Sequence, residues 1–438
     1  MRRTEPVWRG TIMDTSSVPP ELLPPEEWTL FDFDSVYNAF RDSDVYGSEV
    51  YHRTIELVFG PTILGMHGKQ HHDHRSLVAK AFRQTALAQW EPEVIVPICE
   101  KLVDEFIDDG EVDLVKAVTF EFPTRVTAEL LGLPQDDLEL FRRLSLELIS
   151  ITEDIEAGLT ASVELGTYFQ DQVDQRRRKM TDDVIGDLVG AEIDGERLTD
   201  EAIISFLRLL LPAGLETTYR SSGNLLYLLL THPDQLDAVQ SDRELIPAAF
   251  EEGLRFETPL VTVPRSTTCD VEIHGVPIPK GAQVNLCIGS ANRDEKRWDK
   301  ANVFDIHRPR RAHTSFAGGL HSCLGMHLAR VETRVMLTSL FDRATDFELQ
   351  LDDDTRLAGL PFRSPHTSPG HVPQDRMRSR AAILHDVGGP WSVEDFELDP
   401  RGPARCSSRW PPPDCATPTI TSSPVTCRCP TKSPASTA

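Results

Sequence analysis

The sequence has no long apolar run and comparatively little positive charge. No N-terminal segment approaches the roughly 20 apolar residues that span a bilayer, and residues 1–6 (MRRTEP) lack the apolar core of a signal peptide. There are 45 lysines and arginines against 69 aspartates and glutamates, which gives a formal net charge of −24. This acidity argues against nucleic acid and anionic membrane surfaces as partners. We therefore expect a cytoplasmic protein that binds neither membrane nor nucleic acid.

The eight cysteines do not form a disulfide framework. Cys99, Cys269, Cys287 and Cys323 are scattered through the main body, and the other four crowd residues 406–429. The length of 438 residues is sufficient for a large hydrophobic core. A single cysteine is most often a small buried hydrophobe, so a cysteine that does chemistry must be recognised by its surroundings.

Cys323 has such surroundings, because it lies in the glycine-rich segment 316–325 (FAGGLHSCLG). Glycines let the backbone approach its neighbours closely and adopt positive φ angles. The residues after Cys323 have apolar side chains at helical spacing, among them Leu328, Val331 and Val335. A sulfur at the start of a helix is close to free N–H groups and to the positive end of the helix dipole. The pattern therefore favours a thiolate at Cys323.

The segment resembles the haem-binding signature of the cytochrome P450 family. The matching positions are Phe316, Gly319, His321, Cys323 and Gly325. Ala317 departs from the signature, which usually has glycine there. The resemblance implies that Cys323 is the axial ligand of the iron of haem b and that Phe316 and Gly319 belong to the cofactor site. In this family the thiolate donates electron density that favours O–O cleavage.

A second match to the family lies at His71 and Arg75, which are four residues apart and so share one face of a predicted helix. The spacing is similar to that of the family's helix whose histidine and arginine bind a haem propionate, and a cationic pair suits a buried carboxylate. The resemblance assigns two further propionate contacts, Arg265 and His313. The histidines of segment 67–74 leave a metal site open as an alternative, although acidic or cysteine partners at finger-like spacing are missing.

A long central helix is predicted to begin after Thr199 and to run to about Thr231. Thr199 is a good N-cap, and two acidic residues follow it. The middle of the helix contains Pro212 and Gly214, which are poor helix residues. A helix keeps such residues where a local opening is useful.

Glu216 and Thr217 place an acid beside a hydroxyl in this unusual stretch. By themselves they fit a threonine bonded back to a helix carbonyl beside an exposed glutamate. Segment 213–218 (AGLETT), however, resembles the oxygen-binding groove of the family's central helix. The resemblance implies that Glu216 relays protons from solvent and that Thr217 hydrogen-bonds the oxygen that is being reduced.

Glu252 and Arg255 lie three residues apart on a predicted helix and so face the same way. On a surface such a pair is worth under about 1 kcal/mol. It matches the family's Glu-x-x-Arg, and Arg308 matches the second arginine of the same network. Two guanidinium groups on one buried carboxylate are costly to break from one side. We expect this network to hold the loop that carries Cys323.

The resemblance implies a mostly α fold with a minor β region (α+β), the helical prism of the P450 family, with the haem between the central helix and the helix after Cys323. Residues 1–373 are expected to form this haem domain. Two alternatives remain for residues 50–68: a strand with a turn in the core, or a wall of the active-site pocket. The other expected elements are a helix at 31–40, a helix from His71 to about Phe82, two lid helices at 144–161 and 165–173, strands at 262–268 and 271–284, and a hairpin at 361–370.

Residues 374–438 differ from the rest in composition. Segment 381–400 resembles the opening of a zinc-dependent medium-chain alcohol dehydrogenase, and the sequence beyond it is rich in Pro, Thr, Ser, Arg and Cys, where we expect disorder. Our hypothesis is readthrough into a neighbouring dehydrogenase gene followed by loss of frame; an intact single frame at the locus, with this tail in the purified protein, would contradict it. A zinc site is a competing idea, but Cys427-Arg-Cys429 lacks the usual two-residue spacer.

The family resemblance implies a haem-thiolate monooxygenase that activates O2 with two electrons and hydroxylates a small apolar molecule. The electrons are expected to come from NAD(P)H through a ferredoxin reductase and a ferredoxin. Arg83, Arg310 and Arg330 form either a docking patch for that partner or a set of solvated charges. A peroxide-driven peroxygenase and a non-enzymatic haem or ligand sensor remain as alternatives.

Overall fold

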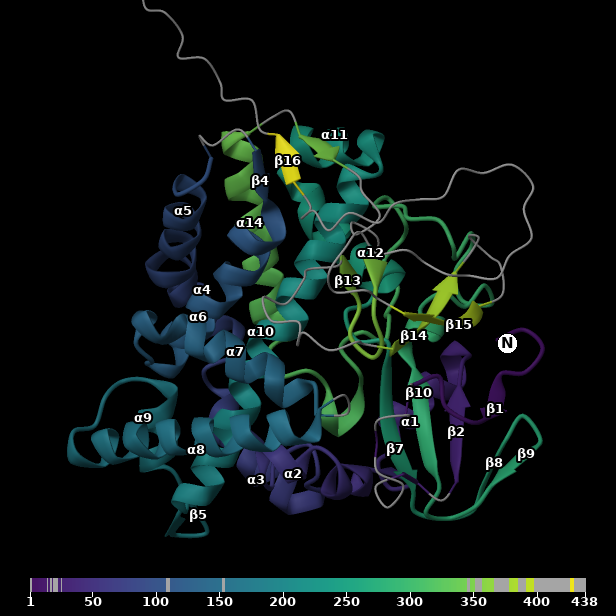
Figure 1. Ribbon diagram of the computed structural model, residues 1–438, viewed down its shortest axis with the longest axis horizontal. Helices are drawn as coiled ribbons and strands as arrows, with labels where there is room; N and C mark the ends of the chain where they lie inside the picture. Colours follow the sequence, from purple (N-terminus) through teal and green to yellow (C-terminus); the bar gives the residue numbers. More distant parts are fainter. Residues whose placement is uncertain are drawn as a thin grey trace, which may run out of the picture.

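Helices make up most of the computed structural model, and a small sheet lies at one side of them (Figure 1). The expected fold class, mostly α with a minor β region, is therefore confirmed. The structure describes residues 2–13, 15, 18, 23–24, 26–107, 111–151, 154–344, 347–350, 357–365, 378–384, 391–397 and 426–428.

The helical elements alternate with short turns along the chain. The α-helices are α1 (Phe33–Arg41), α2 (Glu56–Phe59), α3 (Gly68–Ala79), α4 (Gln84–Trp90), α5 (Val96–Asp104), α6 (Glu121–Leu131), α7 (Leu138–Ile149), α8 (Ile155–Arg178), α9 (Val184–Gly190), α10 (Asp200–Leu230), α11 (Pro233–Ser241), α12 (Ile246–Phe256), α13 (Ile288–Ala291) and α14 (Met326–Arg343). The 3-10 and π turns are η2 (Glu49–Arg53), η3 (Glu91–Ile95), η4 (Val115–Phe120), η5 (Gln135–Asp137), η6 (Arg243–Leu245) and η7 (Gly319–His321).

Helix α10 is the central element, and it begins where the sequence predicts. The Thr199 hydroxyl accepts the N–H of Ala202 at 3.2 Å, so it caps the helix. The helix packs against α6, α7, α8 and α12, and it passes through the middle of the molecule in Figure 1. Gly214 permits the close approach of α6, because a Cβ at this position would lie 2.7 Å from the Thr127 hydroxyl.

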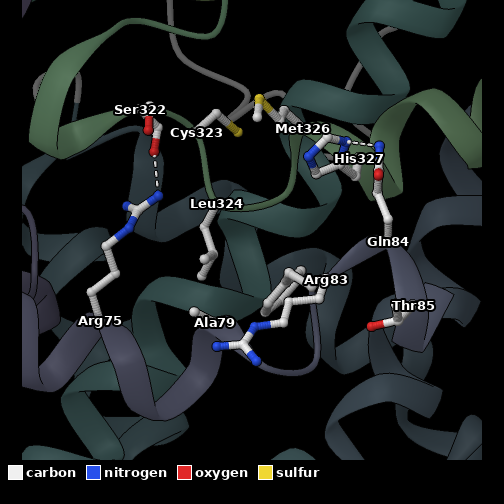
Figure 2. Close-up of a pocket in the computed structure, with 11 residues that line it drawn as sticks. Arg75, Ala79, Arg83, Gln84, Thr85, Ser322, Cys323, Leu324, Met326 and His327 are labelled. Atoms are coloured by element: carbon white, nitrogen blue, oxygen red, sulfur yellow. Dashed lines mark hydrogen bonds between the residues drawn. The ribbon is translucent and has the colours of Figure 1, made fainter.

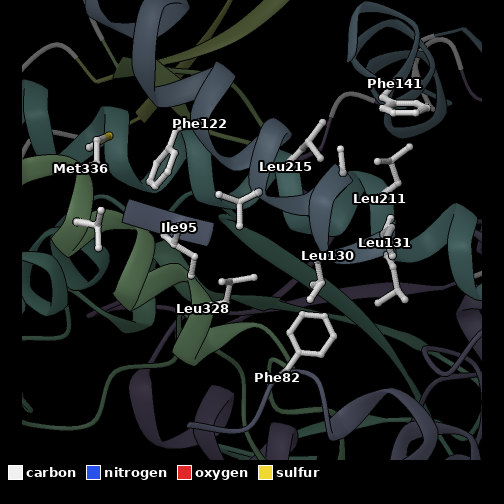
Figure 3. Close-up of a cluster of buried hydrophobic side chains, with 14 of the residues drawn as sticks. Phe82, Ile95, Phe122, Leu130, Leu131, Phe141, Leu211, Leu215, Leu328 and Met336 are labelled. Atoms are coloured by element: carbon white, nitrogen blue, oxygen red, sulfur yellow. The ribbon is translucent and has the colours of Figure 1, made fainter. Parts of the chain in front are cut away.

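The main hydrophobic core surrounds α10. It combines buried side chains from α5, α6, α7, α10 and α14, and Figure 3 shows how they interdigitate. Leu211 and Leu215 of α10 are almost fully buried, as are Ile95 and Phe122. This packing fixes α10 relative to α14, the helix that follows Cys323.

The larger sheet has five short strands in the order β1-β2-β10-β7-β3. All neighbouring pairs are antiparallel except β10 and β2, which are parallel. The strands of this sheet are β1 (Val7–Arg9), β2 (Glu27–Leu30), β3 (Tyr46–Gly47), β7 (Thr262–Thr267) and β10 (Gln283–Cys287). Strand β7 carries Arg265, so this sheet holds one of the residues expected at the cofactor site.

Two predicted segments differ from the structure. Residues 50–68 contain η2 and α2 with connecting turns, so the strand alternative for them is wrong. Of the two lid helices, α7 ends at Ile149 and α8 begins at Ile155, where the Asp154 carboxylate accepts the N–H of Ala157 and caps the helix. Gly158 therefore lies inside α8, where its missing side chain allows contact with Ile151 at the end of α7. Helix α3 begins three residues before His71 and ends three residues before Phe82.

The remaining strands form small pairs. They are β5 (Glu192–Ile193) with β6 (Glu196–Arg197), β8 (Val271–Ile273) with β9 (Val276–Ile278), β12 (Leu357–Ala358) with β13 (Ser364–Pro365), β14 (Arg378–Leu384) with β15 (Trp391–Glu397), and β16 (Thr426–Arg428) between β4 (Glu111–Asp113) and β11 (Glu348–Gln350). The rest of the tail lies outside the described residues, so the domain boundary at 373 and the disorder expected after it stay predictions. No helix in the described ranges is long and apolar enough to cross a membrane.

The cap of α10 can be tested because the Thr199 side chain is exposed. Thr199→Ala removes the hydroxyl that accepts the Ala202 N–H, so we expect it to lower the free energy of unfolding by about 1 kcal/mol. Thr199→Ser keeps the hydroxyl and should stay within about 0.5 kcal/mol of the parent. Urea unfolding followed by circular dichroism measures both variants, and equal losses in the two would contradict the capping role.

Candidate active site

The cysteine loop is held by its own backbone and by α1. The Cys323 N–H donates to the carbonyl of Phe316 at 2.9 Å, which closes the loop. Inside it, Ala317 has a φ of +55° and Gly319 a φ of +63°. A Cβ on Gly319 would lie 2.6 Å from the Phe40 carbonyl oxygen, so only glycine permits this approach to α1. The alanine at 317 is therefore in a conformation that suits the glycine usual in the family signature.

The surroundings of the Cys323 sulfur act on its pKa in opposite directions, and burial, the larger effect, leaves the pKa raised. Burial raises the pKa of the thiol, whereas the backbone N–H groups of Gly325 and Met326 and the positive charges of Arg75 and Arg330 act against that rise. Gly325 is the N-cap of α14, so these are the free N–H groups expected at its start. Metal ligation needs the thiolate, and this loop supplies the partners that a thiolate requires.

A cavity of about 400 Å³ opens beside Cys323. Its lining comes from the cysteine loop, the start of α14, the end of α3 and the start of α4 (Figure 2). Figure 2 also shows Arg75 reaching toward the loop, where its Nη2 donates to the Ser322 carbonyl at 2.7 Å. Arg75 thus binds the residue next to Cys323.

Four nitrogen-bearing side chains meet near the loop: His71, Arg75, Arg265 and His321. The rings of His71 and His321 lie 4.5 Å apart, and Arg265 donates to the Tyr51 hydroxyl at 2.9 Å. Burial and the nearby positive charges, Arg265 first among them, lower the pKa of His321 to about 3. Burial and the charge of Arg75 also lower the pKa of His71.

This cluster fits the carboxylates of a haem. Among the described residues, none of its four members forms an ion pair with a carboxylate. The Nε2 of His71, a residue only 2 % exposed, has no hydrogen-bond partner. Buried charges and polar groups are normally paired, so an anionic group is the complement that this cluster lacks. The residues present therefore suit the haem propionates.

His313 lies in a different environment from the one expected. Its Nε2 is 3.1 Å from Oε2 of Glu251, so this ring already has a carboxylate partner within the protein. His321, which the sequence reasoning noted only as part of the signature, takes the place beside His71 and Arg265. Its position two residues before Cys323 was the available signal, since a side chain so close to the ligand must lie near the same cofactor.

Thr217 and Glu216 project from different sides of α10. Ala213 is exposed and Thr217 partly exposed although both lie in the buried middle of the helix, which marks an accessible face. The Thr217 hydroxyl donates to the Ala213 carbonyl at 3.2 Å. Glu216 is 1 % exposed and its Oε1 has no partner. Burial raises the pKa of Glu216, and the charge of Arg220 acts against that rise.

Arg220 connects Glu216 to the C-terminal hairpin β12–β13. Its Nη2 lies 3.0 Å from Oε2 of Glu216, and its Nη1 donates to the Ser364 hydroxyl at 2.9 Å. The guanidinium also lies over the ring of Phe362, 5.4 Å from its centroid. The acid of the expected acid–hydroxyl pair therefore points toward the hairpin. An i, i+4 Glu–Arg pair was visible in the sequence, but its burial was not.

The structure brings Glu252, Arg255 and Arg308 together. Arg255 binds Glu252 in a two-bond fork, with both N–O distances 2.7 Å, and Nε of Arg308 lies 3.2 Å from Oε1 of the same carboxylate. Arg255 is only 2 % exposed. The network therefore has the buried, two-arginine form expected from the sequence.

Asn292 carries this network to the cysteine loop. Its carbonyl accepts from Arg255 Nη1 at 3.0 Å. Its side chain accepts the N–H of Thr314 at 2.8 Å and donates to the Ser315 hydroxyl at 2.8 Å. Thr314 and Ser315 directly precede the loop that contains Cys323. The arginine network thus holds the base of the loop through one asparagine.

In the residues that the structure describes, no three histidine, cysteine or acidic side chains are placed to hold a bare metal ion. The alternative of a metal at residues 67–74 therefore gains no geometric support. His67 lies near His321 and 3.7 Å from Glu49, and His74 bonds the Gln70 carbonyl.

Comparisons with known proteins agree on one family. The cytochrome P450 family model matches residues 161–358. Cyclomarin C epoxidase CymV of Salinispora arenicola is 34 % identical over 354 residues, which cover 78 % of this chain and 89 % of that protein. Cytochrome P450 107B1 of Saccharopolyspora erythraea is 35 % identical over 296 residues, with 67 % and 73 % covered. The crystal structure of P450BioI with a hexadec-9Z-enoic acid ligated acyl carrier protein has a TM-score of 0.74 at 28 % identity, over 83 % of this chain and 94 % of that one.

A mostly helical body around a cysteine loop and a cationic cluster is the arrangement of a haem-containing oxidoreductase. The chain belongs to the cytochrome P450 family. It is accordingly an oxidoreductase, a monooxygenase of the haem-containing kind.

The backbone of the cysteine loop can be tested with two opposite substitutions. Ala317→Gly relieves a left-handed alanine, so we expect the free energy of unfolding to rise by about 1 kcal/mol. Gly319→Ala forces a Cβ against the Phe40 carbonyl and should lower it by more than about 1 kcal/mol. Urea unfolding of the haem-loaded protein measures both, and shifts of the same sign would contradict the loop geometry.

The cationic cluster can be tested by haem retention. We expect Arg265→Gln and His321→Gln to speed haem transfer to excess apomyoglobin by about tenfold or more, since each removes a charge-assisted or buried hydrogen bond of about 1.5–3 kcal/mol. His313→Gln should change the rate by less than about twofold, because that ring binds Glu251. A larger effect from His313 than from His321 would instead restore the original expectation.

Proposed function

We propose that the protein binds haem b through Cys323 and uses O2 and two electrons to hydroxylate or epoxidise a small apolar substrate. The observation that carries this proposal is the Cys323 sulfur, which receives the N–H groups of Gly325 and Met326 at the start of α14. Haem bound there supplies the redox chemistry that activates O2. His71, Arg75, Arg265 and His321 would hold its propionates, between α10 and α14.

In this proposal Glu216 supplies the protons that O2 reduction needs, and Thr217 positions them. Since burial raises its pKa, the carboxyl of Glu216 holds a proton more readily than an exposed glutamate does. The Thr217 hydroxyl now donates to the Ala213 carbonyl, and a rotation about its Cα–Cβ bond turns that donor toward the accessible face of α10. Thr217 then positions the proton that Glu216 supplies.

The electrons are proposed to come from NAD(P)H through a ferredoxin reductase and a ferredoxin. Arg83 and Arg310 are exposed, and Arg83 lines the cavity beside Cys323, which suits an acidic electron carrier. Arg330 is different because its guanidinium is bound to Glu251. We therefore restrict the docking patch to Arg83 and Arg310 and leave Arg330 out of it.

An apolar substrate is supported by P450BioI, which was solved with a fatty acyl chain on a carrier protein. Epoxidation is supported by CymV, which is named as an epoxidase. A peroxide-driven peroxygenase has no need for Glu216 and Thr217, so their presence favours O2. A non-enzymatic sensor is the remaining alternative. The cytoplasmic location and the 1–373 haem domain followed by a separate tail stay predictions from the sequence.

The ferrous carbonyl spectrum tests the proposal directly. We expect the purified, reduced protein with carbon monoxide to show the red-shifted Soret band of a thiolate-ligated haem, and Cys323→Ala to abolish it. Cys287→Ala is a control, because Cys287 is a buried free cysteine in β10. A wild-type Soret band without the red shift, or a red shift retained in Cys323→Ala, would refute the assignment of Cys323.

The proton roles can be tested with ferredoxin and reductase as the electron source. Glu216→Gln should lower O2-dependent turnover about a hundredfold, within the usual range for loss of an acid–base group. Thr217→Ala should divert electrons to hydrogen peroxide, measured as peroxide formed per NAD(P)H consumed. Thr218→Ser, one residue along, is the control. Full activity with peroxide and none with the redox partners would favour the peroxygenase.

A further inference from the structure

Three charged or polar side chains near the cysteine loop are not used by the proposed chemistry. Glu251 of α12 accepts from Nε2 of His313 at 3.1 Å and from Nε of Arg330 at 2.7 Å. Arg330 belongs to α14, and His313 lies just before the cysteine loop. We call Glu251, His313 and Arg330 the Glu251 bridge. It ties together α12, α14 and the entry of the loop.

The Glu251 bridge encloses Phe316, the first residue of the cysteine loop. The Arg330 guanidinium carbon lies 4.6 Å from the centroid of the Phe316 ring, and the His313 ring lies 5.8 Å from it on a tilted plane. The carbonyl of Phe316 accepts the N–H of Cys323 at 2.9 Å. The bridge therefore acts on the residue that holds the backbone of Cys323.

The bridge also carries charge close to the sulfur. The Arg330 guanidinium brings a positive charge to the start of the cysteine loop, because it lies over the Phe316 ring. Burial alone would raise the pKa of Glu251, but hydrogen bonds from His313 and Arg330 hold it at about 2. Glu251 is therefore ionised at neutral pH, and it fixes and partly offsets the charge of Arg330.

We infer that the Glu251 bridge sets the reduction potential of the haem–thiolate centre, with Arg330 as the charge that favours the reduced state and Glu251 as its fixed counter-charge. The inference rests on the proposed function, in that it needs a haem bound at Cys323. Glu251, His313 and Arg330 are positioning residues, because none of them touches the reacting atoms. The step is the gain of one electron by the ferric centre from an external reductant, with no proton or bond exchanged.

Electrostatics gives the two charged residues opposite effects. Reduction adds one negative charge to the centre, so loss of a nearby positive charge makes it harder and loss of a negative charge makes it easier. Arg330→Met should lower the potential, and Glu251→Gln should raise it. A bridge that only stiffened the loop would give shifts of the same sign, because either change would loosen Phe316.

The test is a redox titration of the full-length, haem-loaded protein, with dithionite as reductant and the Soret band as readout. We expect Arg330→Met to change the reduction equilibrium about tenfold, which is about 59 mV for one electron, and Glu251→Gln to shift it in the opposite direction. Arg330→Lys keeps the charge and should stay nearer the wild type. Arg334→Met is the matched control, since Arg334 lies one turn along α14 and pairs with Glu91.

The outcomes separate this inference from the proposed function. A wild-type protein without the thiolate Soret band removes the proposed function and the inference together. A wild-type protein with that band, but with shifts of one sign or no greater than in Arg334→Met, overturns the inference alone. If Glu251→Gln fails to retain haem, Arg330→Met decides: its side chain is one-third exposed, and a potential that does not fall refutes the role of the bridge.

Discussion

Burial disfavours a thiolate at Cys323, and much of the surrounding structure places hydrogen-bond donors and positive charge that act against this effect. The N–H groups of Gly325 and Met326 supply the hydrogen bonds, and they are aimed at the sulfur only while α14 and the loop keep their relative positions. Asn292 secures the base of the loop to the buried Glu252 network. Gly319 lets the loop press against α1. Each of these contacts positions a group that lowers the cost of negative charge on one sulfur atom.

Features that depend on short spacing could be predicted from the sequence. Glu252 and Arg255 lie three apart on a helix, so their contact follows from helix geometry alone. Thr199 caps α10 because hydroxyl residues before an apolar run commonly do so. The helix that follows Cys323 was evident from its apolar positions, and its free N–H groups followed from helix termini in general. The family resemblance added Arg308, which lies far from Glu252 in the chain.

Features that depend on packing between distant segments could not be predicted in this way. His313 and His321 both lie near Cys323 in sequence, and only the contact of η7 with the neighbourhood of α3 decides which ring meets His71. The burial of Glu216 depends on a hairpin about 150 residues later in the chain, to which Arg220 is joined. The predicted boundary between the lid helices, after residue 161, was misplaced, because α8 begins at Ile155. In the structure, Gly158 lies inside α8, where the absence of a side chain leaves room for Ile151 at the end of α7.

The connection between α10 and the C-terminal hairpin has a consequence for how the chain matures. Arg220 donates a hydrogen bond to the Ser364 hydroxyl, 144 residues later in the chain. Arg363 donates to the Glu257 carboxylate, 106 residues earlier. A ribosome releases those partners only after α10 and α12 have been made, so Arg220 and Glu257 cannot form these hydrogen bonds until then. Contacts of such long sequence separation are formed late and slowly. The middle of α10 therefore completes its contact with the hairpin only after Ser364, 144 residues further along the chain, has been made.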